Sequence, residues 1–204
     1  MATAPGVTVL LEADENDVEI ISTRPPKPIK IVDYNPEWPA MYAEVEGRIR
    51  RALGDRVIRV EHIGSTSVPG LAAKDVIDID LTVSDPADEG SYVPDLQAAG
   101  FQLILREPAW FQHRFFHRDE PYTNLHVFGP DSPELVRHRL FRDWLRDHEE
   151  DRVRYTAVKR EAAEASFAAG EGVLQYNSRK KSVLRDILHR MFEAHGLLDS
   201  STKE

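Results

Sequence analysis

Residues 57–83 carry the clearest structural pattern in the chain, VIRVEHIGSTSVPGLAAKDVIDIDLTV. Branched and apolar side chains predict strands over Val57–Ile63 and Val76–Val83. A polar loop, Gly64–Gly70, and a short helical turn, Leu71–Lys74, connect the two predicted strands. The pattern therefore predicts two strands of one sheet, with a loop rich in glycine and serine at the end of the first.

Two carboxylates stand two residues apart on the second predicted strand. Because side chains alternate across a sheet, Asp78 and Asp80 point to one face and Ile79 points to the core. Carboxylates this close repel each other unless a cation lies between them, and oxygen ligands suit Mg²⁺, or Mn²⁺ in its place. The pattern predicts a metal site at Asp78 and Asp80. The alternative is an exposed strand face with two solvated carboxylates.

The loop before this strand has the composition of a phosphate-binding turn. A turn that contains Gly64 lets backbone N–H groups approach phosphate oxygens, and the hydroxyls of Ser65, Thr66 and Ser67 can donate hydrogen bonds as well. Lys74 is close enough in sequence to reach a phosphate. The loop lacks the glycine and lysine spacing of a P-loop. The alternative is an ordinary turn with Lys74 on the surface.

These motifs together resemble a known family. A strand, Gly-Ser, about a dozen residues and Asp-apolar-Asp are similar to the DNA-polymerase-β-type nucleotidyltransferase superfamily. The longer string from Glu61 to Lys74, continued by Ile77-Asp78-Ile79-Asp80, resembles its GrpB branch. The resemblance covers about Ile29 to Met191, including the segments 34–38 (YNPEW) and 140–145 (LFRDWL).

The resemblance implies a reaction and leaves an alternative open. Catalytic members of the superfamily transfer a nucleoside monophosphate from an NTP, here expected to be ATP, with release of pyrophosphate. The acceptor implied is a small-molecule hydroxyl, amine or carboxylate, and a carboxylate acceptor would make the protein an adenylate-forming ligase. Members of the branch are fused to dephospho-CoA kinase in some bacteria. The alternative is therefore a non-catalytic nucleotide-binding or accessory module.

One position departs from the superfamily pattern. The third carboxylate of the superfamily comes from a later strand, whose counterpart here is Asn124–Phe128 with His126 in the carboxylate position. Imidazole is a poor ligand for Mg²⁺ but a competent proton acceptor when it is neutral. We therefore expect Asp78, Asp80 and His126 to form the catalytic set, with His126 as the base. The alternative is a histidine at the edge of the core.

The helical end of the chain contributes two further candidates through the resemblance. The superfamily uses an aromatic residue to stack on the base and a lysine to bind the triphosphate. Tyr176 and Lys180 have the required i, i+4 spacing on one helix face. A packed tyrosine with an exposed lysine is the alternative. For Tyr155 and Lys159, which share the spacing, this second interpretation is preferred.

The rest of the pattern predicts a mixed α/β (α+β) fold. Helices are expected from Asn35-Pro36 to Gly54 and over Pro86–Ala99, and strands at Ile29–Val32, Phe101–Leu105, Phe111–His117 and Asn124–Phe128. Three helices should follow, from Ser132, over Val153–Ala168 and over Tyr176–His195. The expected organisation is a mobile arm over 1–28, a nucleotidyltransferase-like core with a mixed sheet over 29–130, a helical portion over 131–196 and a tail over 197–204.

A pair of histidines on another predicted strand is the other candidate metal site, and its spacing argues against it. His113 and His117 share a face of the predicted strand, but about 13 Å of strand rise separates them, too far for one ion. Arg114 and Arg118 are better candidates for contacts to phosphates or carboxylates, or they are solvated surface.

Composition limits the partners. The 204 residues have a formal net charge of −9, which disfavours nucleic acid as a partner. No apolar run approaches the roughly 18 residues of a membrane span, and the chain has no cysteine. We therefore expect a cytoplasmic protein whose partners are an NTP and a small-molecule acceptor. The sequence does not predict the oligomeric state.

Overall fold

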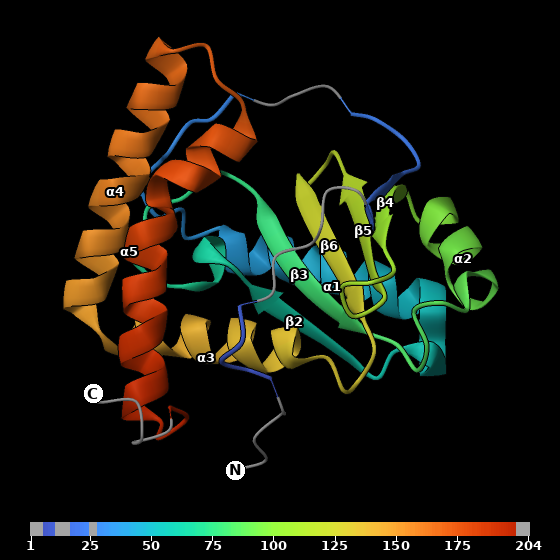
Figure 1. The fold of residues 1–204 in the computed structure, drawn as a ribbon. Coiled ribbons are helices and arrows are strands. Elements are labelled where there is room, and N and C mark those ends of the chain that lie inside the picture. Colours follow the sequence, from blue (N-terminus) through green and yellow to red (C-terminus); the bar gives the residue numbers. More distant parts are fainter. Residues whose placement is uncertain (1–5, 11–16, 25–27, 199–204) are drawn as a thin grey trace.

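The computed structural model describes residues 6–10, 17–24 and 28–198, and these form a mixed sheet with helices on both of its faces (Figure 1). The order of the strands in the sheet is β1-β4-β5-β6-β3-β2. In chain order they are β1 (Glu19–Ile20), β2 (Arg59–Ile63), β3 (Ile77–Thr82), β4 (Gln102–Glu107), β5 (His113–Arg118) and β6 (Thr123–Phe128). The expected mixed α/β fold is confirmed.

The pairing of β3 with β6 positions the chemistry. These central strands are parallel, whereas the other pairs are antiparallel. Asp78 lies opposite Asn124, and Asp80 lies opposite His126. Because residues in register point to the same side of a sheet, all four side chains share one face. Ile79 is fully buried on the other face, as predicted.

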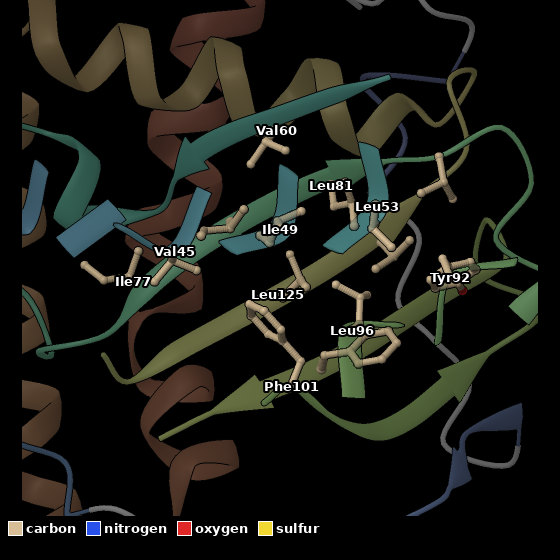
Figure 2. Close-up of a cluster of buried hydrophobic side chains, with 14 of the residues drawn as sticks. Val45, Ile49, Leu53, Val60, Ile77, Leu81, Tyr92, Leu96, Phe101 and Leu125 are labelled. Carbon is tan, nitrogen blue, oxygen red and sulfur yellow. The ribbon is translucent and has the colours of Figure 1, made fainter. Parts of the chain in front are cut away.

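The other face of the sheet packs on α1 (Trp38–Leu53) and α2 (Val93–Ala98) and forms the main hydrophobic core. Val45, Ile49 and Leu53 recur every four residues along α1, and all three are buried. Figure 2 shows them converging with Leu81 and Leu125 of the two central strands. This apolar layer packs against β3 and β6, and the polar residues of these strands point to the opposite face.

Three helices complete the chain: α3 (Pro133–Asp147), α4 (Glu149–Ala168) and α5 (Val173–Ala194). Figure 1 shows α4 and α5 side by side at one end of the sheet. A second apolar cluster joins these helices to the loop after β2. Its buried members are Val68 and Leu71 of the loop and Leu145, Tyr155 and Ile187 of the helices. The helical portion therefore supports the loop that the sequence predicts to bind phosphate.

Some predicted elements differ from the observed ones. The helical turn expected at Leu71–Lys74 is absent there: the backbone N–H and C=O of Ala73 both bond to Val32, and a 3₁₀ turn lies earlier, at Ser65–Ser67. This isolated bridge stands where Ile29–Val32 was expected to form a strand. The helix expected over Pro86–Ala99 is shortened to α2. Proline has no N–H to donate and fits only the first turn, so Pro94 fixes the start of that helix.

Parts of the amino-terminal arm lie against the folded chain. Val7 is buried against α5, and the Arg137 side chain donates hydrogen bonds to the backbone oxygens of Gly6, Val7 and Val9. Strand β1 pairs with β4 at the sheet edge. These described parts of the arm thus contact the folded chain, the remaining arm residues lie outside the described ranges, and the mobile arm stays a prediction. Over the described ranges, no helix has both the length and the apolar character needed to cross a bilayer.

Candidate functional site

Gly64 brings the loop into direct contact with β3. Its φ is +70°, and a Cβ at this position would lie 2.5 Å from Oδ2 of Asp78. Only glycine fits there, since the left-handed conformation and the close approach both exclude a side chain. The hydroxyl of Ser67 donates to the Gly64 carbonyl oxygen at 2.6 Å, and that of Thr66 donates to the Val76 carbonyl oxygen at 3.0 Å. These bonds close the loop onto the carboxylate strand.

The two carboxylates have different surroundings. Asp78 is partly exposed, and its Oδ1 accepts a hydrogen bond of 2.8 Å from the side-chain amide of Asn124. Asp80 is 1% exposed, and its Oδ2 lies 2.9 Å from Nδ1 of His138 on α3. Oδ1 of Asp80 is buried without a hydrogen-bond partner. A buried carboxylate oxygen without a partner, beside a second carboxylate, fits a divalent cation.

The described residues do not form a complete ligand cage by themselves. Over the described ranges, no group of three or more His, Cys, Asp or Glu side chains is placed to hold a metal ion. Mg²⁺ commonly takes one or two carboxylates from the protein and completes its shell with water and substrate phosphates. The pair Asp78 and Asp80 fits that pattern and not an all-protein site.

A pocket opens beside Asp78, between the loop and the helices α4 and α5, and we call it the lysine pocket. Three ammonium groups face it, and Nζ of Lys159 lies 3.1 Å from Oγ of Ser65 and also bonds to the carbonyl oxygen of Ala72. The lining residues are Gly64, Ser65, Thr66, Ala73, Lys74, Val76, Asp78, Asn124, Tyr155, Lys159, Tyr176 and Lys180.

The lysines of this pocket are held in an environment that disfavours their own charge. Burial, together with the charge of neighbouring Lys180, lowers the pKa of Lys159 to about 6. Burial lowers the pKa of Lys180 to about 8 and also lowers the pKa of Lys74. The charge of Asp78 raises the pKa of all three lysines, but Asp78 is the one carboxylate among the described residues that line the pocket. Three lysines that regain or keep their charge when an anion binds, beside one carboxylate, make this a site for an anion.

The rings of two tyrosines lie close to the lysine ammonium groups. Nζ of Lys180 lies 4.9 Å from the ring centroid of Tyr176 and 5.9 Å from that of Tyr155. Lys74 lies 5.2 Å from the Tyr176 ring, which is 1% exposed. Tyr176 is therefore a packed residue that leaves little ring surface for a base. Lys180, its helix neighbour, faces the pocket and not open solvent.

His126 lies further along the same face and outside the pocket lining. Its Nδ1 is 3.0 Å from Nε2 of His113. Burial, with the charge of His113 second, lowers the pKa of His126 to about 4. The ring is therefore neutral at pH 7, as expected, although burial makes it a weaker base than an exposed histidine.

The structure brings most of the predicted site residues together. Gly64, Ser65, Thr66, Lys74, Asp78, Tyr176 and Lys180 all line the lysine pocket, and Asp80 and His126 follow on the same face. The Ser67 side chain turns inward to the loop backbone. Arg114 binds Glu89 and Arg118 binds the Ala99 carbonyl oxygen, so neither arginine lies in the pocket.

Sequence reasoning missed three residues of the site. Lys159 was expected to be exposed, but it is 2% exposed, and that expectation was wrong. Its spacing from Tyr155 repeats that of Lys180 from Tyr176, and this repeat was the available signal. Asn124 and His138 carried no sequence signal for their roles beside the carboxylates. Asn124 also accepts a hydrogen bond of 3.2 Å from Arg24, from the amino-terminal arm.

Comparison with known proteins gives consistent results. A family model described as GrpB protein matches residues 28–190. UPF0157 protein BH1888 of Halalkalibacterium halodurans is 45% identical over 79% of this chain and 82% of its own length. The dephospho-CoA kinase of Mycolicibacterium paratuberculosis is 32% identical over 81% of this chain and 46% of the kinase. A crystal structure of conserved protein GrpB from Enterococcus faecalis has the same fold, with a TM-score of 0.72 at 24% identity, covering 82% of this chain and 99% of that one.

Proposed function

Because the chain belongs to the GrpB family, and because its conserved fold brings an anion pocket beside two carboxylates, we propose that it is a magnesium-dependent nucleotidyltransferase. It transfers AMP from ATP to a hydroxyl, amine or carboxylate of a small molecule and releases pyrophosphate. With a carboxylate acceptor the product is an acyl-adenylate, and the protein would act as a ligase.

The observation that carries the proposal is the convergence of Lys74, Lys159 and Lys180 on one pocket. Charging all three lysines together would cost free energy in the absence of a ligand, because burial and mutual repulsion both disfavour their charge. A triphosphate supplies the compensating negative charge. The cavity measures about 230 Å³, below the range of roughly 300–1,000 Å³ typical of complete ligand sites. It therefore suits the triphosphate, with the nucleoside outside it.

The residues beside the pocket have defined roles in this proposal. Asp78 and Asp80 would hold Mg²⁺, which supplies charge neutralisation at the phosphates when it is bound. Ser65 and the loop backbone orient the terminal phosphates. His126 accepts the proton of the acceptor as its oxygen or nitrogen attacks the α-phosphorus.

Calorimetric titration tests the binding step. Because Lys159 has a pKa of about 6, it is largely neutral at pH 7.5, and a bound triphosphate should restore its proton. We expect Mg²⁺-dependent ATP binding whose apparent enthalpy varies with the ionisation enthalpy of the buffer, which indicates proton uptake. Lys159→Met should reduce the uptake, while Lys30→Met, a change at an exposed lysine, should not. The absence of binding for every NTP would remove the proposal.

A pyrophosphate-release screen over metabolite pools tests the chemical step. Turnover that disappears in Asp80→Asn supports the transferase. The second candidate is a non-catalytic nucleotide-binding or accessory module, favoured by histidine in the place of the third carboxylate and by relatives named dephospho-CoA kinase. Nucleotide binding without turnover over the whole screen supports the module.

A further inference from the structure

A chain of hydrogen bonds runs across the sheet away from the carboxylates. Oε2 of Glu107 on β4 lies 2.5 Å from Nδ1 of His113 on β5. Nε2 of the same histidine lies 3.0 Å from Nδ1 of His126 on β6. Among the described residues, Nε2 of His126 forms no hydrogen bond within the protein. This series of hydrogen bonds therefore begins at the Glu107 carboxylate and ends at Nε2 of His126, which has no partner in the part of the protein that the structure describes.

The proton positions in this series of hydrogen bonds can be assigned by elimination. His113 is neutral, because burial lowers its pKa to about 3, and a neutral imidazole donates from one nitrogen only. Burial raises the pKa of the Glu107 carboxyl, and once that carboxyl is ionised it can only accept, so His113 then donates from Nδ1 to Glu107. Its Nε2 must then accept from Nδ1–H of His126. It follows that Nε2 of His126 has no proton and carries a lone pair.

We propose that Glu107 and His113 are positioning residues that hold His126 in its Nδ1–H tautomer and present its bare Nε2 as the proton acceptor of the reaction. The inference about the tautomer stands on the hydrogen bonds and on the neutral state of the buried His113 ring, and its use in catalysis rests on the function proposed above.

The proton and bond changes balance. As the acceptor oxygen or nitrogen forms a bond to the α-phosphorus of ATP, its proton passes to Nε2 of His126, and the bond from phosphorus to the pyrophosphate oxygen breaks. The imidazolium that forms keeps its Nδ1–H bond to His113, and the carboxylate of Glu107 stabilises the positive charge through that ring. The proton then leaves to water or to pyrophosphate, which restores the starting state.

Aromatic packing fixes the orientation of the middle ring. His113 is 3% exposed, and it stacks on Phe128 at a centroid distance of 4.6 Å with Trp110 edge-on at 5.1 Å. The turn before it contains two residues with φ of 55°, Phe111 and Gln112, a conformation that L-residues adopt at a cost. This turn closes with a hydrogen bond of 3.1 Å from the backbone N–H of His113 to the Trp110 carbonyl oxygen. A strained turn and the contacts with Phe128 and Trp110 thus hold one ring in place.

Nitrogen-15 NMR of the histidine rings tests the tautomer without any activity. In the wild-type protein near pH 7.5, we expect protonated Nδ1 and unprotonated Nε2 for His126, assigned by comparison with His126→Asn. In His113→Phe, which keeps an aromatic ring in the stack, His126 should lose this fixed tautomer. His117 lies on the same strand and face as His113 but is not part of the hydrogen-bond series. His117→Gln should therefore leave the His126 signals unchanged. Protonated Nε2 on His126 in the wild type would overturn the proposal.

Kinetics then separate positioning from general structural support. General bases contribute about 10²- to 10⁴-fold to rate, so losing the fixed tautomer in His113→Phe or Glu107→Leu should lower kcat within that range and change the KM for ATP little. Glu107→Gln, whose amide oxygen can still accept from His113, should retain more activity than Glu107→Leu. Equal kcat in the wild type and in a folded His113→Phe protein refutes the catalytic use. If no transfer is found in the metabolite screen but the tautomer is as stated, the proposed function fails while the hydrogen-bond chain stands.

Discussion

Replacing Lys159 by methionine should stabilise the ligand-free protein at neutral pH. Lys159 is 2% exposed, and no carboxylate among the described residues forms an ion pair with it. Its pKa of about 6 lies below the ordinary lysine value of 10.5. The unfolded chain therefore binds one proton more than the folded chain between about pH 6 and pH 10, and folding carries a cost that grows as the pH falls through this window.

The magnitude follows from linkage. One extra proton in the unfolded state raises the free energy of unfolding by about 1.4 kcal/mol for each unit of pH increase. Between pH 7 and pH 9 this site alone therefore contributes roughly 2 to 3 kcal/mol of increasing stability. Methionine has a similar length and no charge, so Lys159→Met should remove this contribution. The variant should be more stable at pH 7, and its advantage should shrink by roughly the same 2 to 3 kcal/mol at pH 9.

Urea unfolding at pH 7, 8 and 9 provides the measurement, with Lys30→Met as the control at an exposed position. Saturating Mg²⁺ and ATP should stabilise the wild type much more than Lys159→Met, because the ligand supplies the missing counter-charge. Parallel stability curves for the two proteins over this pH range would show that Lys159 keeps an ordinary pKa, and the reasoning would then be refuted.

Four further substitutions test the site and the contacts of the amino-terminal segment. Gly64→Ala should lower the free energy of unfolding by about 1 to 3 kcal/mol and abolish ATP binding, since its Cβ collides with Asp78, as measured by urea unfolding and calorimetry. Gly70→Ala, at φ +78° with no atom within 4 Å, should cost only the conformational penalty of about 1 to 2 kcal/mol and retain binding. Asn124→Asp should weaken Mg²⁺-dependent ATP binding about tenfold or more, because it replaces a donor to Asp78 with a like charge; unchanged affinity in the same titration contradicts this. Arg137→Met should speed hydrogen exchange of the amino-terminal segment about tenfold while ATP affinity stays the same, and unchanged exchange would show that its bonds to that backbone are dispensable.

The fold and the central motif were predictable because their signals are local. The alternation of Asp78, Ile79 and Asp80 is decided by strand geometry, and it placed one side chain in the core and two on the opposite face. Helical spacing from Trp38 onward predicted α1, although the helix begins at Trp38 and not at Pro36. There, the Asn35 side chain bonds to the Glu37 N–H and forms a turn before the helix.

The partners of the site residues were not predictable, because each of them comes from a distant part of the chain. Asn124 bonds to Asp78 across 46 residues, and Lys159 bonds to Ser65 across 94. The repeated spacing of tyrosine and lysine singles out Lys159, but it does not indicate which element on another part of the chain the lysine faces. Burial of a lysine is also rare enough that surface exposure was the reasonable expectation for Lys159.

The apolar contact between the loop and the helical portion has a consequence for genetics. Val68 and Leu71 follow the turn at Gly64–Ser67, and they are covered by residues such as Leu145 and Ile187, which belong to helices far along the sequence. A substitution that loosens either helix residue would let the turn shift relative to the carboxylates. Loss-of-function alleles should therefore arise at hydrophobic positions of the carboxyl-terminal helices as readily as at the polar residues themselves.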